Sequence, residues 1–245
     1  MQPKINIFSD NPAVASAFAA DFVELLRWLA LSQPKVTVSL SGGSTPKLLF
    51  EILANDFTAS VDWSKVHFFW GDERCVPPTD PESNFGVADR LFLSKIEIPD
   101  KNIHRVHGED DPASERVRYS QTIEENVGRN ESGVPSFDIM LLGMGGDGHT
   151  ASIFPAEIEF LRSNRVCEVA SHPESGQRRI TVTGKIINAS KHVFFLVTGT
   201  GKADVLSEII GKTGSYASYP TSHISPSGGS TFYVDQAAAA KLSNV

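Results

Sequence analysis

The sequence predicts an α/β protein built around a mainly parallel β-sheet. Short runs rich in β-branched and aromatic residues alternate with longer segments whose apolar residues recur at helical spacing. The 245 residues, 40% of them hydrophobic, are enough to bury one substantial core. Because no repeat or linker-like run divides the chain, we expect residues 1–245 to form a single domain.

Short apolar runs predict the strands of this sheet. A further run, residues 179–183, alternates like a strand with one exposed face. Residues 155–177 are less regular, and we interpret them as a local excursion rather than a second domain. The strands expected in the main sheet are residues 4–8, 35–40, 66–70, 137–142 and 192–198.

Helices are expected between these strands. From residue 14 to residue 29, apolar side chains recur at helical spacing, with Asn11 as the expected N-cap and Pro12 in the first turn. Residues 204–210 also have a helical pattern. Three dipeptides with the same capping chemistry predict further helix starts: Thr45–Pro46, Ser83–Asn84 and Asp111–Pro112.

The charge and hydropathy of the chain exclude several classes of function. A formal net charge of −7 and an isoelectric point near 5.5 argue against a nucleic-acid binder, although a local basic pocket could still bind a small anion. Asp21, Glu24 and Arg27 interrupt the longest apolar stretch, so we expect no membrane span. The first residues lack the pattern of a signal peptide, and we expect no export.

The two cysteines give no sign of a metal site. Cys75 and Cys167 are far apart and lack CxxC or Cys/His ligand spacing, which argues against both zinc and a disulfide framework. We therefore expect reduced thiols in a cytoplasmic protein that uses no metal and no cofactor.

The first candidate for function is the polar, glycine-rich segment 41–46, which follows the strand at 35–40. Ligands of open α/β sheets bind beyond the carboxyl ends of the strands, and a helix N-terminus offers free N–H groups to an anion. Gly42, Gly43, Ser44 and Thr45 are therefore expected to cradle a phosphate. A tight strand-to-helix turn capped by Thr45 would explain the same residues without a ligand.

The second candidate is the charged segment Asp72, Glu73 and Arg74. It follows the apolar strand at 66–70, so its side chains are expected at the same rim as the glycine-rich loop. A solvated loop with an internal ion pair is the alternative. The proline-rich stretch that follows suits a loop that overhangs a site.

The third candidate is the loop at residues 143–150, where Gly143, Gly145 and Gly148 match the dinucleotide fingerprint GxGxxG. We reject that interpretation because Pro155 would break the long helix that the fingerprint requires. The loop also carries Asp147 and His149, the types of residue that make a general base and its orienting carboxylate.

A turn aspartate and a surface histidine would be the simpler explanation of this pair. Convergence of three such loops on one edge of the sheet favours a functional site instead. Arg178, Arg179 and Lys202 lie near the ends of the last expected strands and could reach the same rim or be solvated surface charges. The surface interpretation is stronger for Arg178 than for Lys202.

Long motifs of this chain resemble the 6-phosphogluconolactonase family, within a wider group that includes the glucosamine-6-phosphate deaminases. The motifs are SLSGGSTPKLLFEIL, WGDERCVPPTDPESNFGVADRLF, FDIMLLGMGGDGHTASIFP, RRITVTGKIINAS, VFFLVTGTGKADVL and FYVDQAAAAKL. The resemblance implies a modified doubly wound, Rossmann-like fold with helices on both faces of the sheet. It also implies hydrolysis of 6-phosphoglucono-1,5-lactone in the oxidative pentose phosphate pathway.

The resemblance also implies roles for individual residues. His149 takes the role of the base with Asp147 beside it, and Arg74 and Lys202 bind the phosphate. Arg179 matches an arginine of the family. The substrate-binding set implied in this way is Gly42, Gly43, Ser44, Thr45, Asp72, Arg74, Arg179 and Lys202. The expected partner is a small sugar-phosphate lactone, and the chain is expected to be a monomer or a homodimer.

The absence of other catalytic motifs agrees with this chemistry. A δ-lactone is an activated ester, so hydrolysis needs a positioned water, a base and stabilisation of the oxyanion. The sequence contains no GxSxG elbow and no HExxH cluster.

Two rival functions remain. A glucosamine-6-phosphate deaminase would need a carboxylate where this chain has Phe154. A sugar-phosphate sensor without catalysis would have no use for the pair Asp147 and His149.

Overall fold

The computed structural model describes residues 3–242 and has the predicted α/β fold. Its main sheet has the strand order β1-β9-β8-β5-β2-β3, and every neighbouring pair is parallel. The strand β9 was not among the strands expected from the sequence. The strands of this sheet are β1 (Lys4–Phe8), β2 (Val36–Leu40), β3 (Val66–Trp70), β5 (Ile139–Leu142), β8 (His192–Val197) and β9 (Ser230–Asp235).

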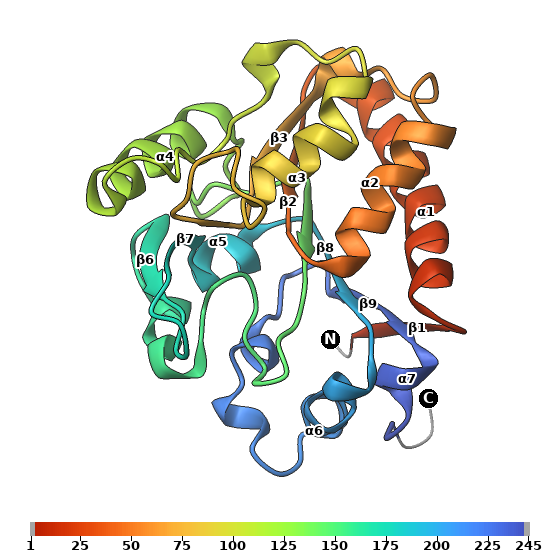
Figure 1. The fold of residues 1–245 in the computed structure, drawn as a ribbon, viewed down its shortest axis with the longest axis vertical. Coiled ribbons are helices and arrows are strands. Elements are labelled where there is room, and N and C mark those ends of the chain that lie inside the picture. Colours follow the sequence, from red (N-terminus) through yellow and green to blue (C-terminus); the bar gives the residue numbers. More distant parts are fainter. Residues whose placement is uncertain (1–2, 243–245) are drawn as a thin grey trace.

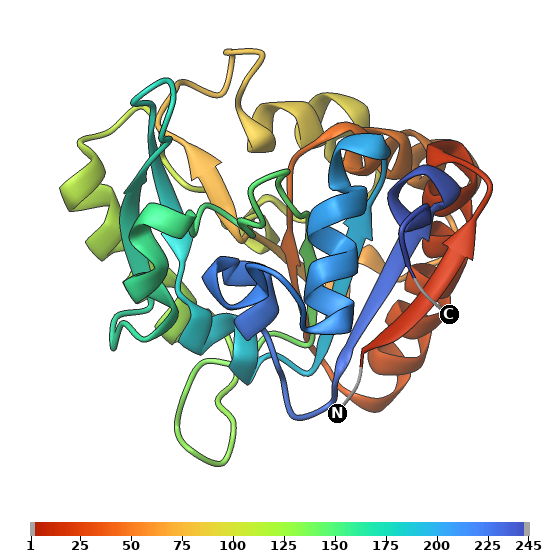
Figure 2. The ribbon, with the colours of Figure 1, turned by 90° about the horizontal axis from the view of Figure 1, so that it is seen from below.

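Helices lie on both faces of this sheet (Figures 1 and 2). One face packs against α1 (Asn11–Ser32), α2 (Ser44–Asp56) and α3 (Asn84–Leu91). Side chains of four other helices belong to the core on the opposite face: α4 (Pro112–Asn126), α5 (Gly184–Ala189), α6 (Ala203–Gly211) and α7 (Gln236–Ala239). Short 3₁₀ helices occupy Trp63–Lys65, Leu93–Lys95, Asp100–Asn102, Pro155–Leu161, Thr200–Lys202, Tyr216–Ser218 and Pro220–His223.

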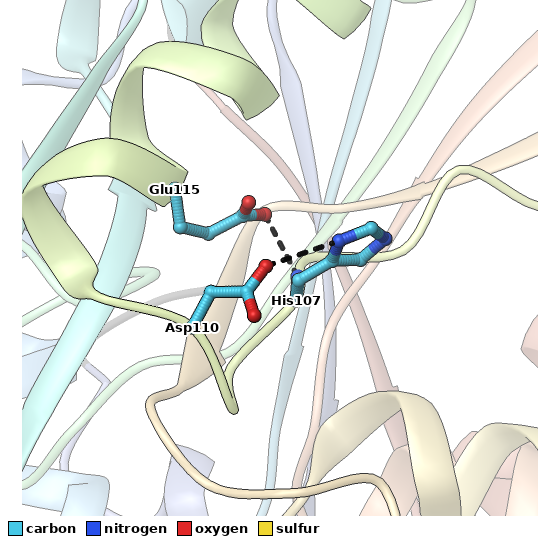
Figure 3. Close-up of side chains that lie close together, drawn as sticks. All are labelled: His107, Asp110 and Glu115. Atoms are coloured by element: carbon cyan, nitrogen blue, oxygen red, sulfur yellow. Dashed lines mark hydrogen bonds and ion pairs between the residues drawn. The ribbon is translucent and has the colours of Figure 1, made fainter.

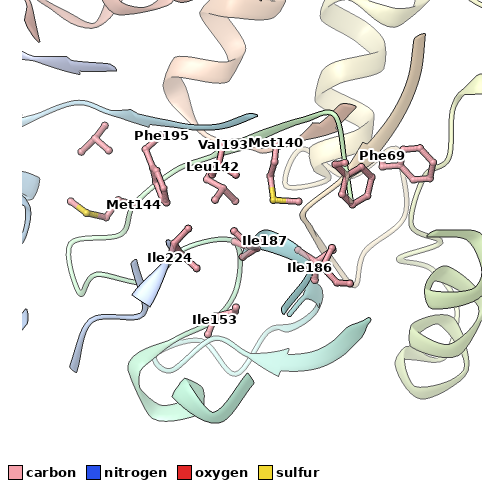
Figure 4. Packing of buried hydrophobic residues seen from close by; sticks show 14 of the residues in the cluster. Phe69, Met140, Leu142, Met144, Ile153, Ile186, Ile187, Val193, Phe195 and Ile224 are labelled. Carbon is pink, nitrogen blue, oxygen red and sulfur yellow. The ribbon is translucent and has the colours of Figure 1, made fainter. Parts of the chain in front are cut away.

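Strand β5 explains why both faces must be covered. Successive side chains of a strand point to opposite faces. Ile139 and Leu141 enter the core beneath α1 and α2, whereas Met140 and Leu142 enter the core on the other side (Figure 4). Because all four are buried, the strand carries a continuous apolar run instead of an alternating one.

A second sheet of three antiparallel strands lies beside the first, in the order β4-β7-β6. It comprises β4 (Asp72–Arg74), β6 (Cys167–Ser171) and β7 (Arg178–Val182). The strand expected at 179–183 is β7, shifted by one residue. The loop expected at Asp72–Arg74 is a strand, and the irregular segment 155–177 contains β6. Both corrections have one cause, since these strands form only by pairing with β7.

Two expected helix caps are wrong. The cap of α1 is Asp10, whose Oδ1 accepts a hydrogen bond from the amide of Ala13 at 2.9 Å, while Asn11 is already in the helix. The cap of α2 is Gly43 rather than Thr45. The Thr45 hydroxyl instead donates to Asn11 Oδ1 at 2.7 Å, so it joins the starts of two helices.

The other helix starts are as expected. Ser83 caps α3 and Asp111 caps α4, each through its side-chain oxygen. The helical pattern at 204–210 lies within α6. Within residues 3–242 no helix is long and apolar enough to cross a membrane.

Both cysteines are free thiols. Burial raises the pKa of Cys75 to about 11 and that of Cys167 to about 12. Since the thiolate is the reactive form of cysteine, neither side chain is suited to act as a nucleophile.

His67 of β3 and His104, which follows the 3₁₀ helix Asp100–Asn102, form a histidine pair. His67 Nδ1 and His104 Nε2 are 2.9 Å apart, and the His104 ring stacks on Phe69 with centroids 4.3 Å apart. Burial, assisted by the charge of Lys35, lowers the pKa of each histidine to about 4. The pair is therefore neutral in the folded protein at pH 7, with one ring donating to the other.

This pair predicts a loss of stability in mild acid. Histidines of an unfolded chain have a pKa of about 6.5, so the unfolded state binds more protons than the folded state between that pH and about 4. The stability that the pair confers is complete above pH 6.5 and is lost as the pH falls toward 4. Urea unfolding at pH 7 and pH 5 should therefore give a smaller difference in His104→Gln than in the wild type. Equal differences in the two proteins would contradict the assignment.

Candidate active site

The candidate site lies where the order of the strands reverses in the main sheet, between β2 and β5. After β2 the chain passes through α2 and adds β3 on one side of β2. The later strands β5 and β8 are added on the other side of β2. Such a switch point leaves a crevice at the carboxyl ends of the strands. A cavity of about 260 Å³ occupies it. His149 and the whole expected substrate-binding set line this cavity, whereas Asp147 and two other candidates, Glu73 and Arg178, do not: the lining includes Gly42, Gly43, Ser44, Thr45, Asp72, Arg74, His149, Arg179 and Lys202.

His149 and Asp147 form a hydrogen-bonded pair in the loop after β5. His149 Nδ1 lies 2.6 Å from Asp147 Oδ1, and the same oxygen accepts a hydrogen bond from the His149 amide at 3.2 Å. A neutral His149 that donates from Nδ1 keeps the lone pair of Nε2, which makes no hydrogen bond within residues 3–242. The arrangement is that of a general base held by a carboxylate.

The carboxylate of Asp147 is strongly held in its ionised form. Burial alone would raise its pKa, but the hydrogen bonds and the charge of His149 lower it to about 2. A carboxylate that stays ionised stabilises the imidazolium formed when His149 takes a proton.

Gly145 is needed for the close approach of this pair. A Cβ at this position would lie 2.1 Å from His149 Nδ1 and 2.4 Å from Asp147 Oδ1. The ring of His149 also packs against Phe154, with centroids 4.7 Å apart. The loop therefore fits the imidazole closely on two sides.

Arg179 approaches the site from the smaller sheet. Its guanidinium lies 5.6 Å from the centre of the Phe154 ring. The same ring packs against His149. Burial lowers the pKa of Arg179, because it disfavours the charged form. An anion in the cavity would offset this cost.

Asp72 contributes a buried carboxylate to the cavity. Its Oδ2 accepts a hydrogen bond of 2.7 Å from the hydroxyl of Ser152, and Arg179 Nη1 lies 3.4 Å from the same hydroxyl. Ser152 is fully buried and thus links the carboxylate to the guanidinium.

Glu73 is not a rim residue, contrary to the expectation that all three charges of its segment face the site. Its carboxylate is buried and accepts hydrogen bonds from the amides of Arg74, Asn84 and Phe85 at 2.7–2.8 Å. Burial raises its pKa, and these hydrogen bonds oppose that effect. Through these hydrogen bonds Glu73 connects β4 to the first turn of α3. The connection holds together the two ends of the proline-rich loop that lies between these elements.

The closed loop places Arg74. Its Nη1 donates to the carbonyl of Glu82 at 2.6 Å, while its buried Nε has no hydrogen-bond partner among residues 3–242. One edge of the guanidinium is therefore fixed by the protein at the lining of the cavity.

Asn84 is a site residue that the sequence analysis did not identify. Its side chain lies over Gly42 so closely that a Cβ on Gly42 would be 1.9 Å from Asn84 Oδ1. Its Nδ2 donates to the carbonyl of Asp72 at 3.0 Å. The only sequence signal was its position after the cap Ser83, which indicates a helix start and not a cavity.

Lys202 enters the cavity at the end of the 3₁₀ turn Thr200–Lys202 and makes no salt bridge within the described part of the chain. The turn is held by Asp235, whose two carboxylate oxygens each accept from the Gly199 amide at 3.0 Å. Arg74, Arg179 and Lys202 give the cavity three cationic side chains. The cavity is therefore suited to an anion.

A cluster outside the cavity has the residue types of a metal site. His107, Asp110 and Glu115 lie close together (Figure 3). However, Arg118 donates to both oxygens of Glu115 at 2.6 Å, and the His107 amide donates to Oε1 at 2.7 Å. The guanidinium supplies the positive charge that a metal would bring, so the cluster is an ion-pair network that closes a loop.

Comparison with known proteins agrees with the fold and identifies the family of the chain. The sequence profile of the family described as glucosamine-6-phosphate isomerases/6-phosphogluconolactonase matches residues 9–233. The chain is 45% identical to the 6-phosphogluconolactonase of Treponema pallidum, over 84% of this chain and 83% of that protein. It is 44% identical to that of Haemophilus influenzae, over 89% and 92%.

Solved structures extend this similarity. The crystal structure of devB protein has a TM-score of 0.90 and 42% identity, covering 98% of this chain and 99% of that one. The 6-phosphogluconolactonase from Trypanosoma brucei has a TM-score of 0.86 and 25% identity, with coverage of 98% and 99%. The chain therefore belongs to the glucosamine-6-phosphate isomerase/6-phosphogluconolactonase family. Its curated relatives mark it as an enzyme of the 6-phosphogluconolactonase type.

The close fit of Gly145 predicts that Gly145→Ala separates His149 from Asp147. The new methyl would occupy the space of both side chains; because both are partly exposed, they can turn toward solvent, and the melting temperature should change little. The pKa of Asp147, titrated by carboxyl ¹³C NMR, should rise from about 2 toward its ordinary value of about 4. Gly128→Ala is the control, since a Cβ there has no neighbour within 4 Å among residues 3–242. An unchanged Asp147 pKa in Gly145→Ala would disprove the contact.

Proposed function

We propose that this protein hydrolyses 6-phospho-D-glucono-1,5-lactone to 6-phospho-D-gluconate in the oxidative pentose phosphate pathway of the cytoplasm. The observation that carries the proposal is the pair of His149 and Asp147 at 2.6 Å, beside a cavity lined by cationic side chains. The names of the relatives support the same reaction.

In the proposed mechanism His149 acts as a general base, without a metal or a covalent intermediate. Nε2 removes a proton from a water as its oxygen attacks C1 of the lactone. The bond between C1 and the ring oxygen then breaks, and the imidazolium returns the proton to the leaving oxygen. Asp147 stabilises the imidazolium between these steps.

The phosphate is proposed to bind at the glycine-rich loop with Arg74 and Lys202. The N-cap of α2 is Gly43, which has no side chain that could accept hydrogen bonds from the first N–H groups of the helix. These groups remain available to an anion. Arg74 and Lys202, which both line the cavity, supply the charge. Arg179, also in the cavity, is the next candidate.

We propose further that residues 1–245 work as one domain, either as a monomer or as a homodimer. The cavity supports the first part, because Arg74 and Arg179 come from the smaller sheet while His149 and Lys202 follow strands of the main sheet. The buried Phe154 ring against His149 argues against a deaminase, which would need a carboxylate there.

The first test is His149→Ala. Turnover of freshly generated lactone, corrected for spontaneous hydrolysis, should fall by ~10²–10⁴-fold, the usual contribution of a general base. Binding of 6-phosphogluconate should persist, because a base acts mainly in the transition state. His107→Ala, which removes a histidine outside the cavity, is the control. Turnover by His149→Ala close to that of the wild type would remove His149 from the mechanism.

The second test concerns the phosphate. Arg74→Ala and Lys202→Ala should each weaken kcat/KM for the phosphorylated lactone by roughly 10- to 100-fold, since each removes a charge-assisted contact. Unphosphorylated gluconolactone should be a poor substrate, nearly indifferent to both changes, which separates a contact with phosphate from damage to the fold. Lys95→Ala, an exposed lysine outside the cavity, is the control. Equal losses with both lactones would refute the phosphate assignment.

A further inference from the structure

We infer that Thr221 is a positioning residue for His149, an inference that rests on the proposed function only where it concerns turnover. Thr221 belongs to the 3₁₀ helix Pro220–His223, far from His149 in the sequence. It is 2% exposed and does not line the cavity.

Thr221 holds the backbone directly before His149 and contacts the carbonyl that follows it. Its amide donates to the carbonyl of Gly148 at 3.0 Å, and its hydroxyl donates to the same carbonyl at 2.9 Å. The hydroxyl also lies 3.4 Å from the carbonyl of His149. These two carbonyls belong to the peptide groups that flank the His149 Cα. Two hydrogen bonds to the first carbonyl and contact with the second limit the directions in which the imidazole can leave the backbone.

Tyr219 strengthens this support from the same segment. Gly148 has a φ of 77°, and a Cβ there would lie 2.5 Å from Tyr219 Cβ, so the tyrosine packs directly on the loop. The Tyr219 hydroxyl donates to Glu208 Oε2 at 3.0 Å. Glu208 is in α6, the helix that begins directly after Lys202. The support for His149 is thus tied to the element that carries the lysine of the cavity.

The loop needs such external support because of its composition. Residues 143–148 include four glycines, which by themselves allow many backbone conformations. Asp147 orients the ring of His149 but belongs to the same loop and would move with it. Thr221 comes from outside the loop and therefore places it relative to the sheet. A shift of about 1 Å at a catalytic group is enough to cost a large part of the rate.

Thr221→Val tests the inference, because it keeps the shape of the side chain and removes only the hydroxyl. We expect kcat to fall about 3- to 10-fold, the range for loss of one hydrogen bond, with unchanged affinity for 6-phosphogluconate. Thr221→Ser, which keeps the hydroxyl, should restore kcat.

Thr183→Val is the matched control. Thr183 is fully buried, and its hydroxyl donates to the carbonyl of Arg165 at 2.8 Å, outside the cavity. Its loss should lower the melting temperature about as much as Thr221→Val, with kcat unchanged. A kcat of Thr221→Val equal to that of Thr183→Val would overturn the inference.

Hydrogen exchange gives a readout that does not depend on the reaction. The peptide covering residues 145–150 should exchange faster in Thr221→Val than in the wild type, and at the wild-type rate in Thr183→Val. Equal exchange in all three proteins would overturn the inference even if the lactone is hydrolysed. A wild type that fails to hydrolyse the lactone would overturn the proposed function, and exchange would still decide the role of Thr221.

Discussion

Burial of both faces of the parallel sheet is the constraint on which the rest of the molecule depends. A strand such as β5, with Met140 and Leu142 in one core and Ile139 and Leu141 in the other, has no side-chain position left for polar chemistry. Polar function is therefore confined to the loops at the strand ends. The order in which strands are added to the sheet reverses between β2 and β5, which separates two of these loops and leaves the cavity between them.

In the smaller sheet, the buried carboxylate of Glu73 positions residues of the cavity although it does not line the cavity itself. Removing the Glu73 carboxylate from water is unfavourable, but three amides and the Ser83 hydroxyl surround it with hydrogen bonds. These bonds fix the end of β4 against α3. Arg74 and Asp72, its neighbours on either side, are held at the cavity as a result.

The loop that carries His149 combines flexible composition with a fixed position. Glycine at 145 leaves room for the Asp147 pair, and glycine at 148 leaves room for Tyr219. The same residues that permit these contacts give the loop little rigidity of its own. Its order comes from packing and hydrogen bonds supplied by Phe154 within the following turn and by Thr221 from a distant segment.

The sequence by itself determined the strands of long apolar runs, the caps at Ser83 and Asp111, and the pair His149 and Asp147, because each depends on residues that are close along the chain. The sequence also predicted that the glycine-rich loop 42–45 and the charged segment 72–74 lie at this rim, and it offered Arg179 and Lys202 as candidates; the resemblance assigned these residues their roles in binding. Tertiary structure alone decided the strands β4, β6 and β9, the inward turn of Glu73, and the contacts of Asn84 and Thr221. A three-residue strand of charged side chains has no periodicity to recognise, and a hydroxyl that meets a carbonyl 73 residues away leaves no local pattern. Only the packing of the completed sheets brings such partners together.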